Sequence, residues 1–129
     1  MSIPNLKTIL VADAITCTGV FAVGLLAATP VGSLLGLPAN MVATGGWTCL
    51  AAAIAMIVAV LQKLPSPALV RLIVFGNLGW VAASLAVVAA FAAQMTGIGI
   101  AVVALQAIGV LGFAILEGKA VAVPRTVTV

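Results

Sequence analysis

Few side chains in this 129-residue sequence carry the functional groups that chemistry needs. Asp13 and Glu117 are the only acidic residues, Cys17 and Cys49 are the only cysteines, and histidine and tyrosine are absent. The lack of histidine excludes imidazole-bound haem, histidine metal sites and Ser–His catalytic triads. Two cysteines without further ligands do not form a zinc or iron–sulfur site. We therefore expect a protein that is not an enzyme and that has no catalytic residue, metal ion or cofactor.

The two cysteines lie in apolar stretches of the chain. A free cysteine in such surroundings commonly packs as a small hydrophobic side chain. We therefore predict that Cys17 and Cys49 are buried free thiols. A disulfide between them is the alternative.

The composition indicates a membrane protein of one domain. Hydrophobic residue types make up 65% of the chain and charged types 5%, whereas a soluble domain carries about 25% charged residues. The mean hydropathy of +1.44 suits burial in lipid rather than a surface in water. These values exclude a soluble enzyme and a disordered chain, so we expect residues 1–129 to form a single transmembrane domain. The net charge of +3 is not gathered into a basic patch with aromatic residues, so the expected partner is the lipid bilayer and not nucleic acid.

Four apolar segments are long enough to cross the bilayer as helices, since about 20 residues span about 30 Å of hydrocarbon. Asn5 and Ser66 are candidate N-caps of the first and third segments, and Gly118 is a candidate left-handed C-cap of the fourth. The predicted helices are 6–28, 41–61, 67–93 and 97–117, followed by a tail over 118–129.

The connections predict an all-α, up-down-up-down four-helix bundle. The segments 62–66 and 94–96 are short, so the helices that they join should be antiparallel neighbours. The segment 29–39 contains two prolines, two glycines and three leucines, which predicts a loop in the membrane interface. Every lysine and arginine falls at one end of this bundle, so the positive-inside rule places both termini in the cytoplasm and the chain in a bacterial inner membrane. These basic residues are Lys7, Lys63, Arg71, Lys119 and Arg125.

Polar side chains inside a membrane span are costly, so they mark a candidate intramembrane polar site. Asp13, Asn77 and Gln106 come to a similar depth and could form one polar layer. Trp80 and Ser84 follow Asn77 by three and seven positions and share its helix face. One interpretation is that these side chains hydrogen-bond one another and hold the helices together. The other interpretation is a site for a ligand or a proton.

Two further patterns concern the polar residues. Glu117 lies close to Lys119, which favours a charge at the membrane interface, although its spacing of eleven from Gln106 returns to nearly the same helix face. The segment Leu6–Asp13 also resembles Val70–Asn77, because in each a basic residue precedes a short polar one by six positions. That offset of 64 residues fits two tandem helical hairpins, or a chance pattern in apolar sequence.

Small residues recur at helical spacing and permit close helix contact in lipid. One interpretation is packing within the chain, and the other is a homodimer or a larger membrane complex formed through these faces. The stripes comprise Ala52, Ala55 and Ala59; Ala82, Ala86, Ala89, Ala90 and Ala93; and Gly109 and Gly112.

Asp13, the loop Leu35–Pro38 and the segment Arg71–Ser84 give the chain a resemblance to the small four-helix integral membrane proteins that are common in bacteria. That resemblance implies the same fold and brings no catalytic role. Asp13 is also placed similarly to the proton-exchanging carboxylate of small multidrug resistance transporters. The sequence departs from that family because its acid is aspartate rather than glutamate, tyrosine is absent and aromatic residues are few.

We therefore expect a non-enzymatic membrane protein that acts as an accessory, assembly or interaction subunit, because its helix faces are rich in alanine and its chemistry is minimal. The alternative is a small proton-coupled transporter or channel that uses Asp13. A third interpretation, binding of a lipid or quinone between helices, depends on Phe75, Asn77 and Trp80.

Overall fold

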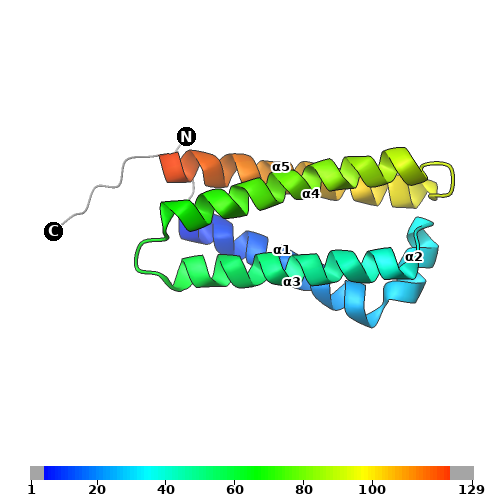
Figure 1. Ribbon diagram of the computed structural model, residues 1–129, viewed down its shortest axis with the longest axis horizontal. Coiled ribbons are helices and arrows are strands. Elements are labelled where there is room, and N and C mark those ends of the chain that lie inside the picture. The colour runs from blue at the N-terminus through cyan, green and yellow to red at the C-terminus, as the bar shows by residue number, and fades with distance from the viewer. Residues whose placement is uncertain (1–4, 123–129) are drawn as a thin grey trace.

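The computed structural model describes residues 5–122, and these residues form five helices and no strand (Figure 1). Four of the helices are long and apolar enough to cross a membrane, which agrees with the prediction of an all-helical, multi-pass membrane protein. The remaining helix, α2, has only eight residues and is too short. The helices are α1 (Leu6–Leu26), α2 (Ala28–Leu35), α3 (Ala39–Leu61), α4 (Pro67–Phe91) and α5 (Gly97–Ala122).

The four long helices pack as two antiparallel pairs that face each other (Figure 1). α1 lies alongside α3 and forms the first hairpin with it, and α4 lies alongside α5 in the second hairpin. Across the two hairpins, α1 contacts α5 and α3 contacts α4. The start of α1, the α3–α4 connection and the end of α5 lie at one end of the molecule, and α2 and the α4–α5 connection lie at the other.

Capping residues account for some of the helix ends. The side chain of Asn5 accepts a hydrogen bond from the Lys7 backbone N–H at 2.9 Å, which confirms Asn5 as the N-cap of α1. Ser66 precedes α4 without a side-chain capping bond, and Pro67 occupies the first turn, where a helix needs no N–H. The prediction that Gly118 ends the last helix is wrong, because α5 continues for four more residues. Glycine inside a helix costs about 1 kcal/mol relative to alanine, which is too little to end a helix by itself.

Two predicted non-helical segments are corrected. The supposed interfacial loop over 29–39 is largely helical: α2 follows a break at Ala27 and ends at Gly36, whose φ of 75° is left-handed and suits glycine. Pro30 lies in the first turn of α2, where proline is tolerated, and Gly36 and Pro38 follow the end of this short helix. Of the predicted tail 118–129, the first five residues belong to α5, and the others lie outside the described residues.

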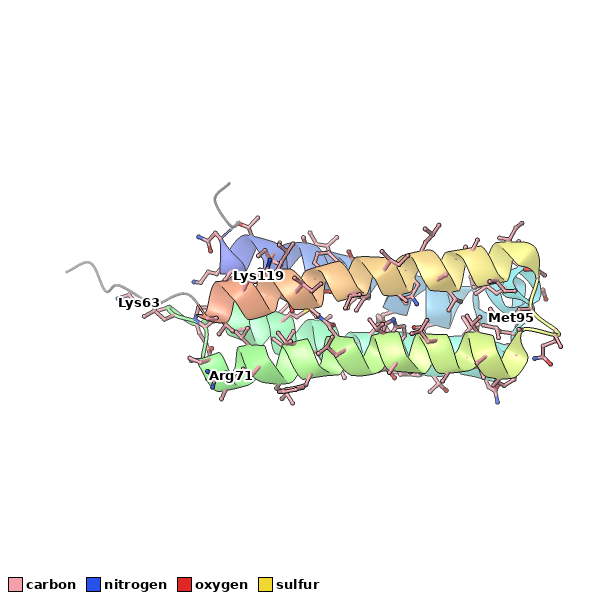
Figure 2. The ribbon with its side chains drawn as sticks, turned by 90° about the horizontal axis from the view of Figure 1, so that it is seen from above. Lys63, Arg71, Met95 and Lys119 are labelled. Atoms are coloured by element: carbon pink, nitrogen blue, oxygen red, sulfur yellow. The ribbon has the colours of Figure 1, made fainter. Side chains whose placement is uncertain are left out.

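α2 ties the two hairpins together at one end of the molecule. Thr96, in the α4–α5 connection, donates from its backbone N–H to the Leu35 carbonyl at 3.1 Å and from its hydroxyl to the Leu34 carbonyl at 2.6 Å. Gly36 lies so close to the backbone of this connection that a Cβ atom there would clash. The end of the molecule that carries Met95 is therefore closed by backbone contacts (Figure 2).

An apolar core closes the opposite end, near the α3–α4 connection. Side chains from α1, α3 and α4 meet there, whereas large apolar side chains elsewhere point outward, such as Leu26 and Phe75 with exposed fractions of 88% and 70%. Such an outward apolar surface suits contact with lipid tails. The core comprises Leu10, Ala14, Met56, Ala59, Val70 and Ile73.

The predicted stripes of small residues differ in their packing. Ala59, in the α3 stripe, is fully buried, and Ala52 and Ala55 pack against the core, so this stripe serves contacts within the chain. The interpretation of packing within the chain is wrong for the second stripe, because all its members are exposed. These are Ala82, Ala86, Ala89, Ala90 and Ala93.

We predict that Gly24→Val destabilises the protein, whereas Gly19→Val does not. A Cβ atom on Gly24 would lie 3.1 Å from both the Gly46 Cα atom and the Val42 carbonyl oxygen, whereas a Cβ atom on Gly19 meets nothing within 4 Å. Separating α1 from α3 should lower the free energy of unfolding by about 1–3 kcal/mol. Equilibrium unfolding in mixed detergent micelles measures it, and equal losses in the two variants would contradict this close approach.

Candidate functional site

Asn77 of α4 joins three helices through its side-chain amide. Its Nδ2 atom donates one hydrogen bond to Asp13 Oδ2 at 2.8 Å and another to Glu117 Oε2 at 3.1 Å. The three residues are buried, and the two acids have exposed fractions of 1% and 0%. We call Asp13, Asn77 and Glu117 the carboxyl cluster. It links α1, α4 and α5 and therefore connects the two hairpins.

The repeated pattern in the sequence accounts for part of this geometry. Asp13 and Asn77, which occupy matching positions at an offset of 64, bond directly to each other. One turn before each of them stands a buried isoleucine, Ile9 or Ile73. The matched positions therefore lie on the buried faces of α1 and α4.

Glu117 is not an exposed charge beside Lys119, since it is completely buried and bonded to Asn77. α5 extends beyond it, so Glu117 is inside the helix rather than at its end. The sequence signal was its spacing of eleven from Gln106, which returns to the inward face of the helix. In the sequence, the nearby Lys119 favoured an exposed charge instead. In the structure Lys119 is exposed, but Glu117 points inward.

The carboxyl cluster holds more acceptors than donors. Asp13 Oδ1 has only the thiol of Cys17 as a donor, at 3.7 Å, and the buried Glu117 Oε1 has no hydrogen-bond partner. Within residues 5–122, no lysine or arginine pairs with either acid. Two carboxylates around one amide in an apolar interior cannot both be ionised at an acceptable cost, so the cluster must hold at least one proton or a cation.

A second polar cluster joins α4 and α5 nearer to the α4–α5 connection. All its polar side-chain groups have hydrogen-bond partners. Trp80 Nε1 donates to Gln106 Oε1 at 2.7 Å, and Gln106 Nε2 donates to Ser84 Oγ and to the Val103 carbonyl, both at 2.9 Å. The Ser84 hydroxyl donates to the Trp80 carbonyl at 2.8 Å. This indole cluster, Trp80, Ser84 and Gln106, binds α4 to α5 with no group left over.

The predicted polar layer is therefore two clusters. Gln106 does not reach Asp13 or Asn77, because it lies about 16 Å along α5 from Glu117, and Glu117 is the residue that meets Asn77. Trp80 and Ser84 bond with Gln106 instead. The sequence identified the polar residues, but their partners depend on the relative shift of α4 and α5.

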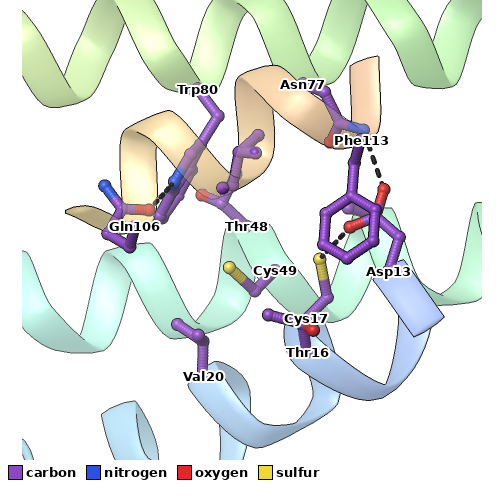
Figure 3. A pocket seen from close by; sticks show the side chains of 13 residues that line it. Asp13, Thr16, Cys17, Val20, Thr48, Cys49, Asn77, Trp80, Gln106 and Phe113 are labelled. Carbon is purple, nitrogen blue, oxygen red and sulfur yellow. Dashed lines mark hydrogen bonds between the residues drawn. The ribbon is translucent and has the colours of Figure 1, made fainter. Parts of the chain in front are cut away.

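A cavity of about 150 Å³ lies between the two clusters (Figure 3). Asp13 and Asn77 line one end of it, and Trp80 and Gln106 line the other. The remaining wall is mostly apolar and comes from α1, α3 and α5, with Phe113 among its members. An apolar protein cavity of about this volume can hold a molecule the size of benzene.

The two cysteines also line this cavity (Figure 3). Both are free thiols, and Cys49 is buried whereas Cys17 is half-buried. The prediction of buried free thiols is therefore confirmed for Cys49 and holds partly for Cys17. In the part of the chain that the structure describes, no three histidine, cysteine or acidic side chains come together in a way that could hold a metal ion.

No protein family matches the chain, and neither a curated protein nor a solved structure is similar to it.

We predict that the bond between Trp80 and Gln106 stabilises the second hairpin modestly. Trp80→Phe should leave Gln106 Oε1 without its donor, and Gln106→Leu should remove the acceptor. In a double-mutant cycle, the coupling energy should be about 0.6 kcal/mol and at most about 1.7 kcal/mol, as found for hydrogen bonds between membrane helices. Unfolding in mixed micelles measures it, and additive effects of the two substitutions would show that the bond adds no stability.

Proposed function

We propose that the protein is a small proton-coupled transporter or channel, in which Asp13 exchanges a proton when a solute occupies the adjoining cavity. The observation that carries this proposal is the shortage of hydrogen-bond donors in the carboxyl cluster beside a cavity. A solute that brings donors of its own would complete the set.

The contrast between the two clusters supports a functional role for the carboxyl cluster. Groups that only hold helices together should be satisfied by one another, as Trp80, Ser84 and Gln106 are. The carboxyl cluster leaves the buried Glu117 Oε1 unbonded and places Asp13 on the cavity wall. Ionisable groups inside a membrane protein that lack such satisfaction mark substrate, ion or proton sites.

Asp13 is the member best placed for exchange. Both acids are buried, but only Asp13 lines the cavity, together with Asn77. Asn77 keeps its two donated bonds to the carboxyls in either protonation state, so it positions Asp13 without losing its own partners. A proton that leaves Asp13 would be replaced by the positive charge of the solute, which avoids an isolated buried carboxylate.

We further propose a membrane orientation with both termini in the cytoplasm and the four long helices arranged as an up-down-up-down bundle in a bacterial inner membrane. The support is the placement of the basic residues: Lys63, Arg71 and Lys119 gather at one end of the molecule, and Met95 marks the other (Figure 2). An excess of lysine and arginine favours the cytoplasmic side.

We predict that a small organic cation releases about one proton per chain from the wild-type protein and none from Asp13→Asn. The purified protein is titrated in weakly buffered detergent with guanidinium, methylammonium and benzylammonium, and a pH indicator reports the release. Ile15→Ala is the matched control, because its side chain is 67% exposed and points away from the cavity. Release that survives Asp13→Asn, or no release with any of the three cations, contradicts the proposal.

An accessory or assembly subunit is the second candidate function, and an exposed seam on α4 favours it. The seam alternates spacings of three and four residues, the repeat of helices that pair in a left-handed coil. A Cβ atom on Gly76 or Gly79 would meet nothing within 4 Å, so the seam has no partner among the described residues. Its members are Gly76, Gly79, Ala83, Ala86 and Ala90.

We predict, for this second candidate, that Gly79→Leu separates the protein from its assembly whereas Gly19→Leu does not. Both glycines are exposed with open space around them, but only Gly79 lies in the seam. A leucine there would hold a neighbouring backbone away. Native mass spectrometry of the protein released from membranes measures the assembled mass, and a wild-type protein that is only monomeric would contradict this function.

A further inference from the structure

The repeat of 64 residues extends to the walls of the cavity. The offset that matches Asp13 with Asn77 also matches Thr16 with Trp80 and Gly45 with Gly109. Thr16, Trp80 and Gly109 all line the cavity. Trp80 of α4 lies beside Gly45 of α3, whereas the matching residues Thr16 and Gly109 belong to α1 and α5, which also contact each other.

The two sides of the cavity are therefore closed differently. On the α3–α4 side, a Cβ atom on Gly45 would lie 3.4 Å from Cη2 of Trp80, so the indole fills the space beside that glycine. On the α1–α5 side a small threonine stands in place of the indole, and a Cβ atom on Gly109 would meet nothing within 4 Å. Thr16, Gly109 and the neighbouring Val20 are all exposed as well as lining the cavity.

This less covered side lies at the depth of the lipid tails. Thr16 is the eleventh of the 21 residues of α1, and Gly109 is the thirteenth of the 26 residues of α5. Each is thus near the middle of a span: Thr16 is about 15 Å from either end of α1, and Gly109 is about 18–20 Å from either end of α5. Along the helices, α2 lies beyond one end of the cavity and the apolar core beyond the other (Figure 1).

We propose that the cavity exchanges its solute sideways with the lipid, between Thr16 and Gly109, and that the solute is a lipid-soluble amine with one ring-sized apolar body. The inference rests on the proposed function and adds the route and the class of solute. The side of the cavity at Thr16 suits an apolar solute, because the Thr16 hydroxyl already donates its hydrogen bond to the Ala12 carbonyl at 3.0 Å and does not need a partner from the solute. The cavity volume of about 150 Å³ suits a single ring.

The chemistry of the step balances within the cavity. At neutral pH the amine is mainly an ammonium ion in water, and it leaves one proton in the water when it dissolves in the hydrocarbon as the neutral amine; this is the proton that the indicator detects. The neutral amine then passes between Thr16 and Gly109. Its nitrogen lone pair then takes the proton of the Asp13 carboxyl, which yields an ammonium ion paired with the Asp13 carboxylate. Trp80 lies at the other end of the cavity, where its indole can pack against the ring of the amine. Asn77 continues to donate to Asp13 Oδ2 and stabilises the carboxylate.

The test is to close the α1–α5 side of the cavity with a tryptophan, the side chain that already fills the α3–α4 side. Thr16→Trp places an indole against Gly109, as Trp80 lies against Gly45. Ile15→Trp adds the same side chain at an adjacent, outward position that is 67% exposed and does not line the cavity. Each protein is placed in lipid nanodiscs, and stopped-flow measurement with a pH indicator follows proton release on mixing with benzylamine.

We expect Thr16→Trp to slow proton release by about tenfold or more, because a conformational change must then precede binding, and Ile15→Trp to match the wild type. Gly109→Leu, a second way to obstruct the same side, should also slow release. The unfolding temperatures of Thr16→Trp and Gly109→Leu are compared with that of the wild type to show that both variants are folded.

Unchanged rates in Thr16→Trp and Gly109→Leu would overturn the sideways route. Guanidinium-driven release without any response to benzylamine would overturn the class of solute. In either of these two outcomes, proton release that depends on Asp13 would still support the proposed function. If no cation causes release, both the proposed function and the sideways route are contradicted.

Discussion

The hydrogen bonds of one amide determine how the two halves of this protein meet. Asn77 donates to Asp13 in the first hairpin and to Glu117 within its own hairpin. In lipid there is no hydrophobic driving force between helices, so association depends on packing and on such polar contacts. The first hairpin has close packing at Gly24 and Gly46, but the contact across the hairpins requires a buried donor at the depth of two buried acids. The register of α4 against both α1 and α5 follows from this requirement.

The same interaction makes the site chemically incomplete. An amide has two protons to donate, and both are used, while the two carboxyl groups have four oxygens between them. The thiol of Cys17 is a weak donor to one of the rest, and Glu117 Oε1 has none. If these residues only joined helices, a single acid or a second amide in place of one acid would have matched the number of donors to the number of acceptors. The surplus of acceptors therefore distinguishes this cluster from the satisfied bonds of Trp80, Gln106 and Ser84, and it favours a site over a purely structural link.

The two halves of the internal repeat carry different residues at the positions that line the cavity. Asp13 and Asn77 are matched positions with different chemistry: one carries a carboxyl and the other the amide that binds it. Thr16 and Trp80 are matched positions with different volumes, and only the indole fills the space beside its glycine. A perfectly repeated chain would have two equal sides and two equal polar groups. The differences leave one side of the cavity less covered than the other, beside a single acid on the cavity wall.

Apolar composition and run lengths by themselves determined the helical class, the four possible spans and half of their bounds, because a span needs about 20 apolar residues. The polar positions Asp13, Asn77, Gln106, Trp80 and Ser84 were also visible, since polar groups are rare in such a chain. Only the tertiary structure decided that Glu117 is buried and that Gln106 belongs to a second cluster, because both depend on how far one helix is shifted along another. The helix in the 29–39 connection likewise depends on docking of Leu34 and Leu35 against Thr96. A pattern along one helix does not contain that information, because the energy that fixes the shift comes from a partner distant in sequence.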